Sequence, residues 1–253
     1  MNIDVSGPKV FFTIPLNIPI LGDLQISETM VVSWLVMIII TGLCIWLTHD
    51  LKVENISKRQ AAAEMIVETL NNFVIGNMGE RFRYMIPFVG ALFSTSLVSN
   101  LISLTGLRSP TADLSTEAAW AVVVFIMITH QKLKTNGLGG YLKGFTEPIP
   151  VMTPFNILGE ISTPVSMACR HFGNIFSGIV IGGLIYGALA VLSTAVLGLI
   201  PGAVGHVLAQ IPIFDVGIPA ITGFYFDWFT SCMQAFIFSM LTIMYIAQEA
   251  GDE

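Results

Sequence analysis

A single arginine, Arg170, lies inside a long apolar stretch of this sequence. It is the one residue between positions 161 and 214 that carries a full charge at neutral pH. Arginine keeps its proton at every accessible pH. A fixed charge at membrane depth is costly, so it usually marks an ion pathway or pairs with a charge of opposite sign. The nearest acid on its own segment is Glu160, so a purely structural arginine would need a partner from elsewhere in the chain.

Polar residues on two apolar segments are spaced so that they could face Arg170. Asn174 follows Arg170 by four residues and therefore shares its helix face. In the last segment, Gln234 follows Asp227 by seven residues and Tyr245 follows Gln234 by eleven, close to two and three helical turns. These three side chains should point the same way. If the segments pack together, Gln234 could hydrogen-bond the guanidinium of Arg170.

Each of these polar residues also has a structural interpretation. Asn174 and Gln234 could join helices, as polar side chains do in membranes. Tyr245, near a helix end, could be an interfacial anchor. Asp227 could be a solvated acid near the start of its helix.

Further polar residues flank the arginine segment. Asn100 belongs to a serine-rich cluster that either lines a water-filled passage or bonds neighbouring helices. Glu160 precedes the expected arginine helix and is either a solvated first-turn acid or the inner mouth of a channel. Asp113 is expected to cap a span, and His171, beside a fixed positive charge, is expected to be neutral.

Glycines recur after Arg170. Two pairs have the small-xxx-small spacing that allows close backbone approach of another helix: Gly178 with Gly182 and Gly183 with Gly187. They provide either packing within this chain or a smooth face against a moving partner.

The composition is that of a membrane protein. The 253 residues are 54% hydrophobic and only 11% charged, against about 25% charged residues in a soluble domain. The net charge of −6 and the lack of a basic face argue against nucleic-acid binding. Three cysteines lack metal-ligand spacing, and P-loop, HExxH and GxSxG motifs are absent. We therefore expect no metal, no cofactor and no hydrolytic or redox chemistry.

The expected fold is an all-α polytopic membrane protein forming one domain, 1–253, with about five membrane helices. Segment 1–28 is expected outside the bilayer, and 57–75 reads as an amphipathic helix that lies on the membrane or packs on another subunit. Ser57 and Gln60 form a capping-box pattern at the start of that helix. The last two segments form a helix pair, 164–248; the first is about 55 Å long as a helix, against a hydrocarbon core of about 30 Å, so steep tilt is expected. The expected spans are 30–48, 84–107, 117–129, 164–200 and 220–248.

Orientation follows from the distribution of lysine and arginine. Segments 49–83 and 130–147 hold eight of the eleven basic residues. The positive-inside rule places both on the cytoplasmic side. With five crossings, the N-terminus lies outside and the C-terminus inside.

Several stretches resemble the F-type ATP synthase subunit a family. PVSMACRHFGNIFSGI, with FTEPIPVMTPFNILGEISTP before it, resembles the family's arginine-helix signature. MQAFIFSMLTIMYIA is similar to its final helix, and SPTADLSTEAAWAVVVF to its middle hairpin. The resemblance runs from about residue 80 onward.

The resemblance implies roles for particular residues. Arg170 corresponds to the essential stator arginine, Asn174 follows it in the RxFGN pattern, and Gln234 is the glutamine of QAFIF. Some bacterial members carry an acid nine residues after the arginine and a histidine seven before the glutamine, where this chain has Ile179 and Asp227. Asp227 is therefore the expected acid of the outer half-channel. A histidine also replaces the leucine common after the arginine.

The function implied is ion translocation in the membrane sector of an ATP synthase, without catalysis by the chain itself. Two offset aqueous half-channels, separated by Arg170, would pass H⁺ or Na⁺ to the carboxylates of a rotating c-ring. The partners implied are that ring, peripheral-stalk subunit b and the lipid bilayer, in a bacterial plasma membrane. The alternative function is a secondary transporter that binds an anionic substrate at Arg170, although no convincing internal repeat supports it.

Overall fold

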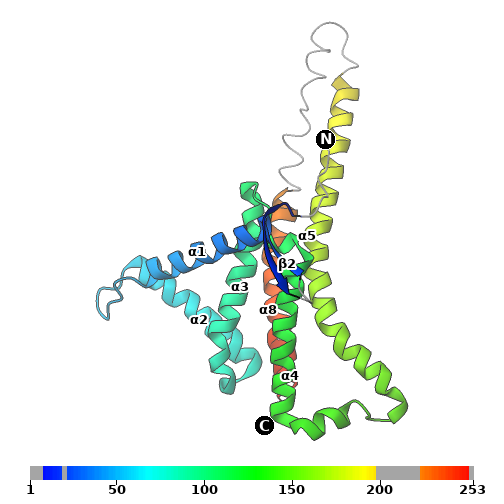
Figure 1. The fold of residues 1–253 in the computed structure, drawn as a ribbon. Helices are drawn as coiled ribbons and strands as arrows, with labels where there is room; N and C mark the ends of the chain where they lie inside the picture. The colour runs from blue at the N-terminus through cyan, green and yellow to red at the C-terminus, as the bar shows by residue number, and fades with distance from the viewer. Residues whose placement is uncertain (1–7, 19–21, 198–222, 251–253) are drawn as a thin grey trace.

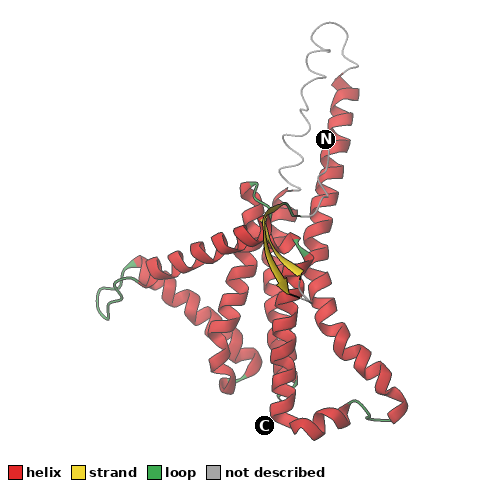
Figure 2. Ribbon diagram, viewed as in Figure 1, coloured by secondary structure: helices red, strands yellow, loops and turns green. Residues whose placement is uncertain are grey.

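Long helices form most of the molecule, and a two-stranded hairpin precedes them (Figures 1 and 2). The computed structural model describes residues 8–18, 22–197 and 223–250. The helices α3, α4 and α8 run side by side, α5 packs on α4, and α1 with α2 forms a V beside α3. The elements are β1 (Val10–Ile18), β2 (Gly22–Ser27), α1 (Glu28–Thr48), α2 (Lys58–Met78), η1 (Glu80–Met85), α3 (Ile86–Leu101), η2 (Ile102–Thr105), η3 (Pro110–Ala112), α4 (Leu114–Gly144), η4 (Pro150–Met152), α5 (Thr153–Leu197), η5 (Phe224–Phe229) and α8 (Thr230–Gln248).

Five of the described helical segments are long and apolar enough to cross a membrane. They include the three expected between residues 28 and 144, and two further segments, Pro150–Leu197 and Phe224–Gln248, on either side of the gap at 198–222. The expected membrane fold with five spans is therefore confirmed. The tilt of the last two segments stays a prediction, and their expected ends at 198–200 and 220–222 lie outside the described residues.

The N-terminal segment contains a hairpin that the sequence did not predict. Strands β1 and β2 pair antiparallel, with Val10 opposite Ser27 and Phe12 opposite Ile26. Adjacent apolar residues in β1, such as Phe11 and Phe12, hide the alternation that normally signals a strand. Phe11 and Phe12 are both more than 60% exposed.

The α2 helix covers the predicted amphipathic segment and extends three residues further, to Met78. Ser57 caps it by accepting a hydrogen bond from the backbone N–H of Gln60. The Gln60 side chain bonds the backbone of Lys52 instead of completing a capping box. Met65 and Ile66, on the predicted apolar face, are exposed, so this face is open to lipid or to another subunit.

The third span is longer than predicted. Its expected range was 117–129, but α4 begins at Leu114 because Asp113 caps it, accepting a bond from the Ser115 N–H at 3.0 Å. The helix continues through the polar residues that we assigned to a loop. Its regular geometry breaks at Gly137, which has a positive φ of 65°.

The arginine helix also starts earlier than predicted. We expected it to begin at Pro164, but α5 starts at Thr153 and contains Pro164 inside it. Membrane helices tolerate an internal proline because neighbouring groups satisfy the carbonyl that it leaves free. Glu160 is therefore within the helix, not before it.

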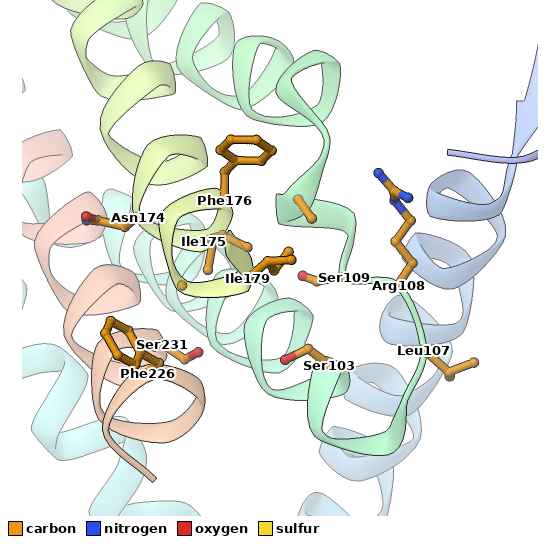
Figure 3. Close-up of a pocket in the computed structure, with 12 residues that line it drawn as sticks. Ser103, Leu107, Arg108, Ser109, Asn174, Ile175, Phe176, Ile179, Phe226 and Ser231 are labelled. Carbon is orange, nitrogen blue, oxygen red and sulfur yellow. The ribbon is translucent and has the colours of Figure 1, made fainter. Parts of the chain in front are cut away.

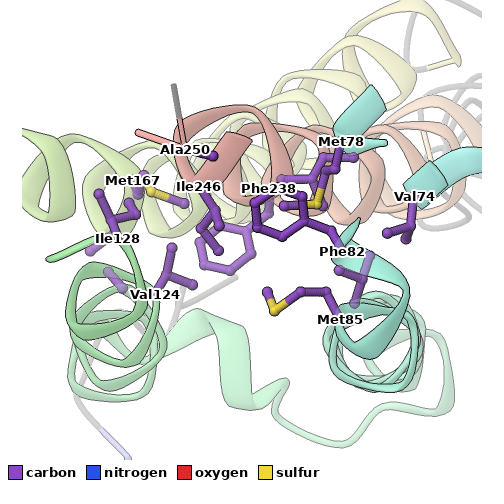
Figure 4. Close-up of a cluster of buried hydrophobic side chains, with 14 residues drawn as sticks. Val74, Met78, Phe82, Met85, Val124, Ile128, Met167, Phe238, Ile246 and Ala250 are labelled. Carbon is purple, nitrogen blue, oxygen red and sulfur yellow. The ribbon is translucent and has the colours of Figure 1, made fainter. Parts of the chain in front are cut away.

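A hydrophobic cluster joins the helices around α8. Phe238, 1% exposed, contacts side chains from the other helices in this cluster (Figure 4). Val74 and Met78 come from α2, and Val124 and Ile128 from α4. This cluster holds α8 in place beside α5.

Candidate functional site

The site begins where α5 meets α8. The Asn174 side chain donates a hydrogen bond to Oε1 of Gln234, with 2.6 Å between the heavy atoms. Gln234 is 1% exposed, whereas Arg170, one turn before Asn174, is exposed. The expectation that Gln234 bonds Arg170 is therefore wrong: the α5–α8 contact uses Asn174, which leaves the guanidinium free to face outward.

The contacts of α5 are concentrated at the turn that carries Arg170. Of its 45 residues only four are buried, and three of them are Met167, Ala168 and His171. These three lie on one helix face. Cys169 and Arg170 lie on the other side and are exposed.

Asn100 is part of a buried network that joins several elements. Its Nδ2 donates to the backbone carbonyl of Ser231 and lies 3.3 Å from Nε2 of His171. Its Oδ1 accepts from the hydroxyl of Thr111 at 2.6 Å. Of the two interpretations left open, bonding between neighbouring segments therefore describes Asn100, which is 1% exposed.

Glu160 forms an ion pair between helices. Its Oε2 lies 2.7 Å from Nζ of Lys132 on α4, which is also 3.4 Å from Oε1 of Glu249, just after α8. This cluster ties together α4, α5 and the end of α8. Glu160 is thus not a solvated first-turn acid.

Of the expected stripe, Gln234 and Tyr245 lie eleven residues apart on the regular helix α8 and so share a helix face. Asp227 lies in the π-helical turn η5, whose wider spacing invalidates a count based on 3.6 residues per turn. Its side chain lies outside the described part of the structure. Tyr245 is partly buried and packs against the hydrophobic cluster around Phe238.

Two cavities lie along α5 beyond Asn174. The first, of about 240 Å³, has Ser103, Ser109, Asn174 and Ser231 among its lining residues (Figure 3). The second, of about 140 Å³, lies one turn further along α5, beside Ile179 and Phe226. Ile179, at the position where some relatives have an acid, lines both.

The glycines after Arg170 fall into two groups. A Cβ at Gly178 would lie 3.8 Å from the Phe226 ring, so this glycine packs within the chain. At Gly173, Gly182 and Gly187, a Cβ would have no described atom within 4 Å. Gly178 therefore serves packing within this chain, whereas the other three glycines leave open space beside α5.

Sequence reasoning missed two charged residues of this region, Glu117 and Lys132. Glu117 is 0% exposed, and its Oε2 lies 3.0 Å from Nδ1 of His171. A charged residue inside a short predicted span was the available signal, since such a residue usually has a partner. In the described ranges, no group of three or more His, Cys, Asp or Glu side chains could hold a metal ion.

Comparison with known proteins agrees with the family resemblance found in the sequence. Residues 30–247 match the model of the family described as ATP synthase A chain. The chain is 30% identical to the sodium-ion-specific ATP synthase subunit a of Propionigenium modestum, over 98% of this chain and 86% of that relative. It is 34% identical to ATP synthase subunit a 1 of Crocosphaera subtropica, over 88% and 87% of the two chains. Its identity to ATP synthase subunit a of Desulforamulus reducens is also 34%, over 89% and 80%.

Proposed function

This chain belongs to the ATP synthase A chain family, and from that premise we propose that it forms the ion path between the membrane and a rotating c-ring. Two aqueous half-channels, offset on either side of Arg170, would connect the ring's carboxylates to opposite sides of the membrane. The ring and subunit b of the peripheral stalk are the proposed partners. We place the chain in a bacterial plasma membrane, with its N-terminus outside and its C-terminus in the cytoplasm.

The observation that carries this proposal is the outward position of Arg170. The residue is exposed, and the buried residues of its turn, Met167, Ala168 and His171, lie on a different face of α5. An uncompensated guanidinium facing lipid would be costly. A passing carboxylate from another subunit would compensate that charge, and the open glycine positions leave room for a close helix.

The cavities along α5 support the position of the outer half-channel. They lie beyond Asn174, on the side that the positive-inside rule places outside. Serine and asparagine residues contribute to the lining of the first cavity. The shared residue Phe226 is the chain neighbour of Asp227. We therefore keep Asp227 as the proposed acid of this half-channel, with Asn174, Gln234 and Asn100 positioning the helices beside it.

The inner half-channel is proposed on the other side of Arg170, toward Glu160 and Tyr245. Glu160 lies ten residues before Arg170 on α5 and is bound to Lys132. In this proposal the ion pair holds the inner ends of α4, α5 and α8 at a fixed separation. Tyr245 supplies a hydroxyl near the same end of α8.

The chemistry of the path follows from electrostatics. A loaded, neutral carboxyl of the ring can face lipid, but a bare carboxylate cannot. At about 4 Å and an effective dielectric constant of about 20, Arg170 attracts that carboxylate by about 4 kcal/mol. This favours release of the ion about a thousandfold. Each elementary charge crossing about 100 mV supplies about 2.3 kcal/mol to drive the ring.

Co-purification and ATP synthesis test the proposal together. We expect a ring-forming proteolipid to accompany the full chain out of detergent. Vesicles containing that complex should make ATP when an H⁺ or Na⁺ gradient is imposed, and separate gradients would identify the ion. Because one relative is named sodium ion specific, both ions are tested. Uptake of an organic anion by the chain alone, without a ring, would instead support a secondary transporter.

Replacing Asp227 by asparagine is expected to lower ion flux through the assembled complex by about tenfold or more, because an amide cannot exchange a proton or bind a cation as a carboxylate does. Flux is measured as uptake per assembled complex across a range of pH. Asp113→Asn is the matched control, since asparagine caps a helix as well as aspartate does. Wild-type flux from Asp227→Asn at every pH would remove Asp227 from the path.

A further inference from the structure

The strongest unused feature is a fully buried pair of ionisable side chains beside Arg170. Glu117 on α4 and His171 on α5 are both 0% exposed, and their Oε2 and Nδ1 atoms are 3.0 Å apart. Neither residue lines the cavities beside Asn174. The pair is therefore not part of the proposed aqueous path.

The hydrogen bonds around His171 define which ring nitrogen carries a proton. Nδ2 of Asn100 faces the backbone carbonyl of Ser231, which can only accept, so the orientation of the amide is fixed. The same Nδ2 lies 3.3 Å from Nε2 of His171, which must then act as the acceptor. The proton of the imidazole is consequently on Nδ1, the ring nitrogen that lies 3.0 Å from Oε2 of Glu117.

The imidazole is also enclosed by aromatic rings. Trp120 on α4 and Phe238 on α8 lie 6.2 and 5.4 Å from it, measured between ring centroids. Together with Asn100, these contacts hold His171 from three helices other than its own. A side chain held on all sides cannot turn without breaking a buried hydrogen bond, which is costly away from water.

The position of Arg170 depends on this arrangement because neighbouring helical residues are about 100° apart around the axis. With His171 directed inward, Arg170 must lie on the outer part of the helix surface. Apart from Ser193, the other buried residues of α5 are Met167 and Ala168. Their apolar contacts do not fix the rotation of α5 about its axis. Near Arg170, that rotation is fixed by the polar contacts of His171 and Asn174.

We propose that the Glu117–His171 pair is a positioning device that sets the rotation of α5 and so directs Arg170 outward. The effect of this pair on ion transport rests on the proposed function, but its effect on the rotation of α5 can be tested separately.

The test measures helix rotation by thiol labelling in the purified complex. Ala168, 5% exposed, is replaced by cysteine after the three native cysteines are changed to alanine. With α5 fixed, N-ethylmaleimide should react slowly at position 168. His171→Leu should raise that rate about tenfold, because it increases the fraction of molecules in which α5 is rotated or separated from the neighbouring helices. It should lower ATP-driven ion uptake per assembled complex by a similar factor.

The exchanged pair Glu117→His with His171→Glu is the rescue variant. A carboxylate at position 171 can still accept from Nδ2 of Asn100, and an imidazole at position 117 can still donate to it. Labelling and uptake should return to within about threefold of the parent if the pair sets the rotation. If the His171→Leu complex does not assemble, Glu117→Gln is used instead, because it keeps the packing volume. Glu117→Gln should also raise the rate of labelling at position 168.

Lys132→Gln is the matched control, because it breaks a partly buried α4–α5 ion pair whose acid, Glu160, lies ten residues before Arg170. It should leave labelling at position 168 unchanged. Unchanged labelling and uptake per complex in His171→Leu or Glu117→Gln would overturn the inference and leave the pair as structural packing. Arg170→Ala should abolish uptake without changing labelling, so normal uptake in that variant would reject the proposed function alone.

Discussion

Arg170→Ala is expected to abolish ATP synthesis driven by an ion gradient while the complex still assembles. The residue is exposed and has no ion-pair partner among the described residues, so its loss should not unfold the helix bundle. What disappears is the attraction of about 4 kcal/mol that makes a passing carboxylate release its ion. ATP yield in reconstituted vesicles, normalised to assembled complex, measures the effect.

Arg170→Lys separates charge from geometry. A lysine keeps a positive charge but lacks the planar group that binds a carboxylate with two parallel hydrogen bonds. We expect residual synthesis from this variant and none from alanine. Equal loss in both would show that guanidinium geometry matters as much as charge, whereas a normal ATP yield from alanine would contradict the proposed role of Arg170.

Loss of the Asn174–Gln234 hydrogen bond should have the second largest effect. In membranes such a bond contributes about 1–2 kcal/mol at most. That corresponds to about a tenfold change in the population of correctly placed helices. Gln234→Leu should therefore reduce ATP-driven uptake per complex by about tenfold and leave most of the complex assembled.

A double-mutant cycle tests whether the bond itself is responsible. If Asn174 and Gln234 act through their shared contact of 2.6 Å, Asn174→Leu combined with Gln234→Leu should be no worse than either variant alone. If the fold-losses of uptake in the two single variants multiply in the double variant, the two amides act independently along the path. Uptake and ATP hydrolysis are measured on the same vesicles.

The spans could be predicted because length and hydropathy determine them directly. The apolar run of α1 and the capping residues Ser57 and Asp113 are local signals, and the structure contains the helices that they predicted. Helix ends were less predictable. Pro164 and the polar residues after His130 both suggested boundaries that neighbouring helices override.

The pairing of side chains could not be predicted, because it depends on the rotation and register of distant helices. Gln234 faces Asn174 instead of Arg170. The π-helical turn at Asp227 changed the angular relation between that residue and the rest of α8. Such a turn inserts extra backbone without a clear mark in the sequence.

The Glu117–His171 pair could have been suggested by the cost of burying a carboxylate in a membrane span. A carboxylate inside a membrane span needs a partner, and His171 was the buried residue still lacking one. The two residues are 54 positions apart in the chain, so no local spacing links them in the sequence. What they have in common is that each is costly to bury without a partner. Treating unpaired charges in different spans as candidate partners would have suggested this pair.

The most direct test of the ion path measures ATP hydrolysis and ion uptake simultaneously in vesicles that contain either the parent complex or Arg170→Ala. If Arg170 separates two half-channels and drives ion release from the ring, hydrolysis in the variant should produce no net ion uptake. A parent-like number of ions moved per ATP in Arg170→Ala would contradict that role.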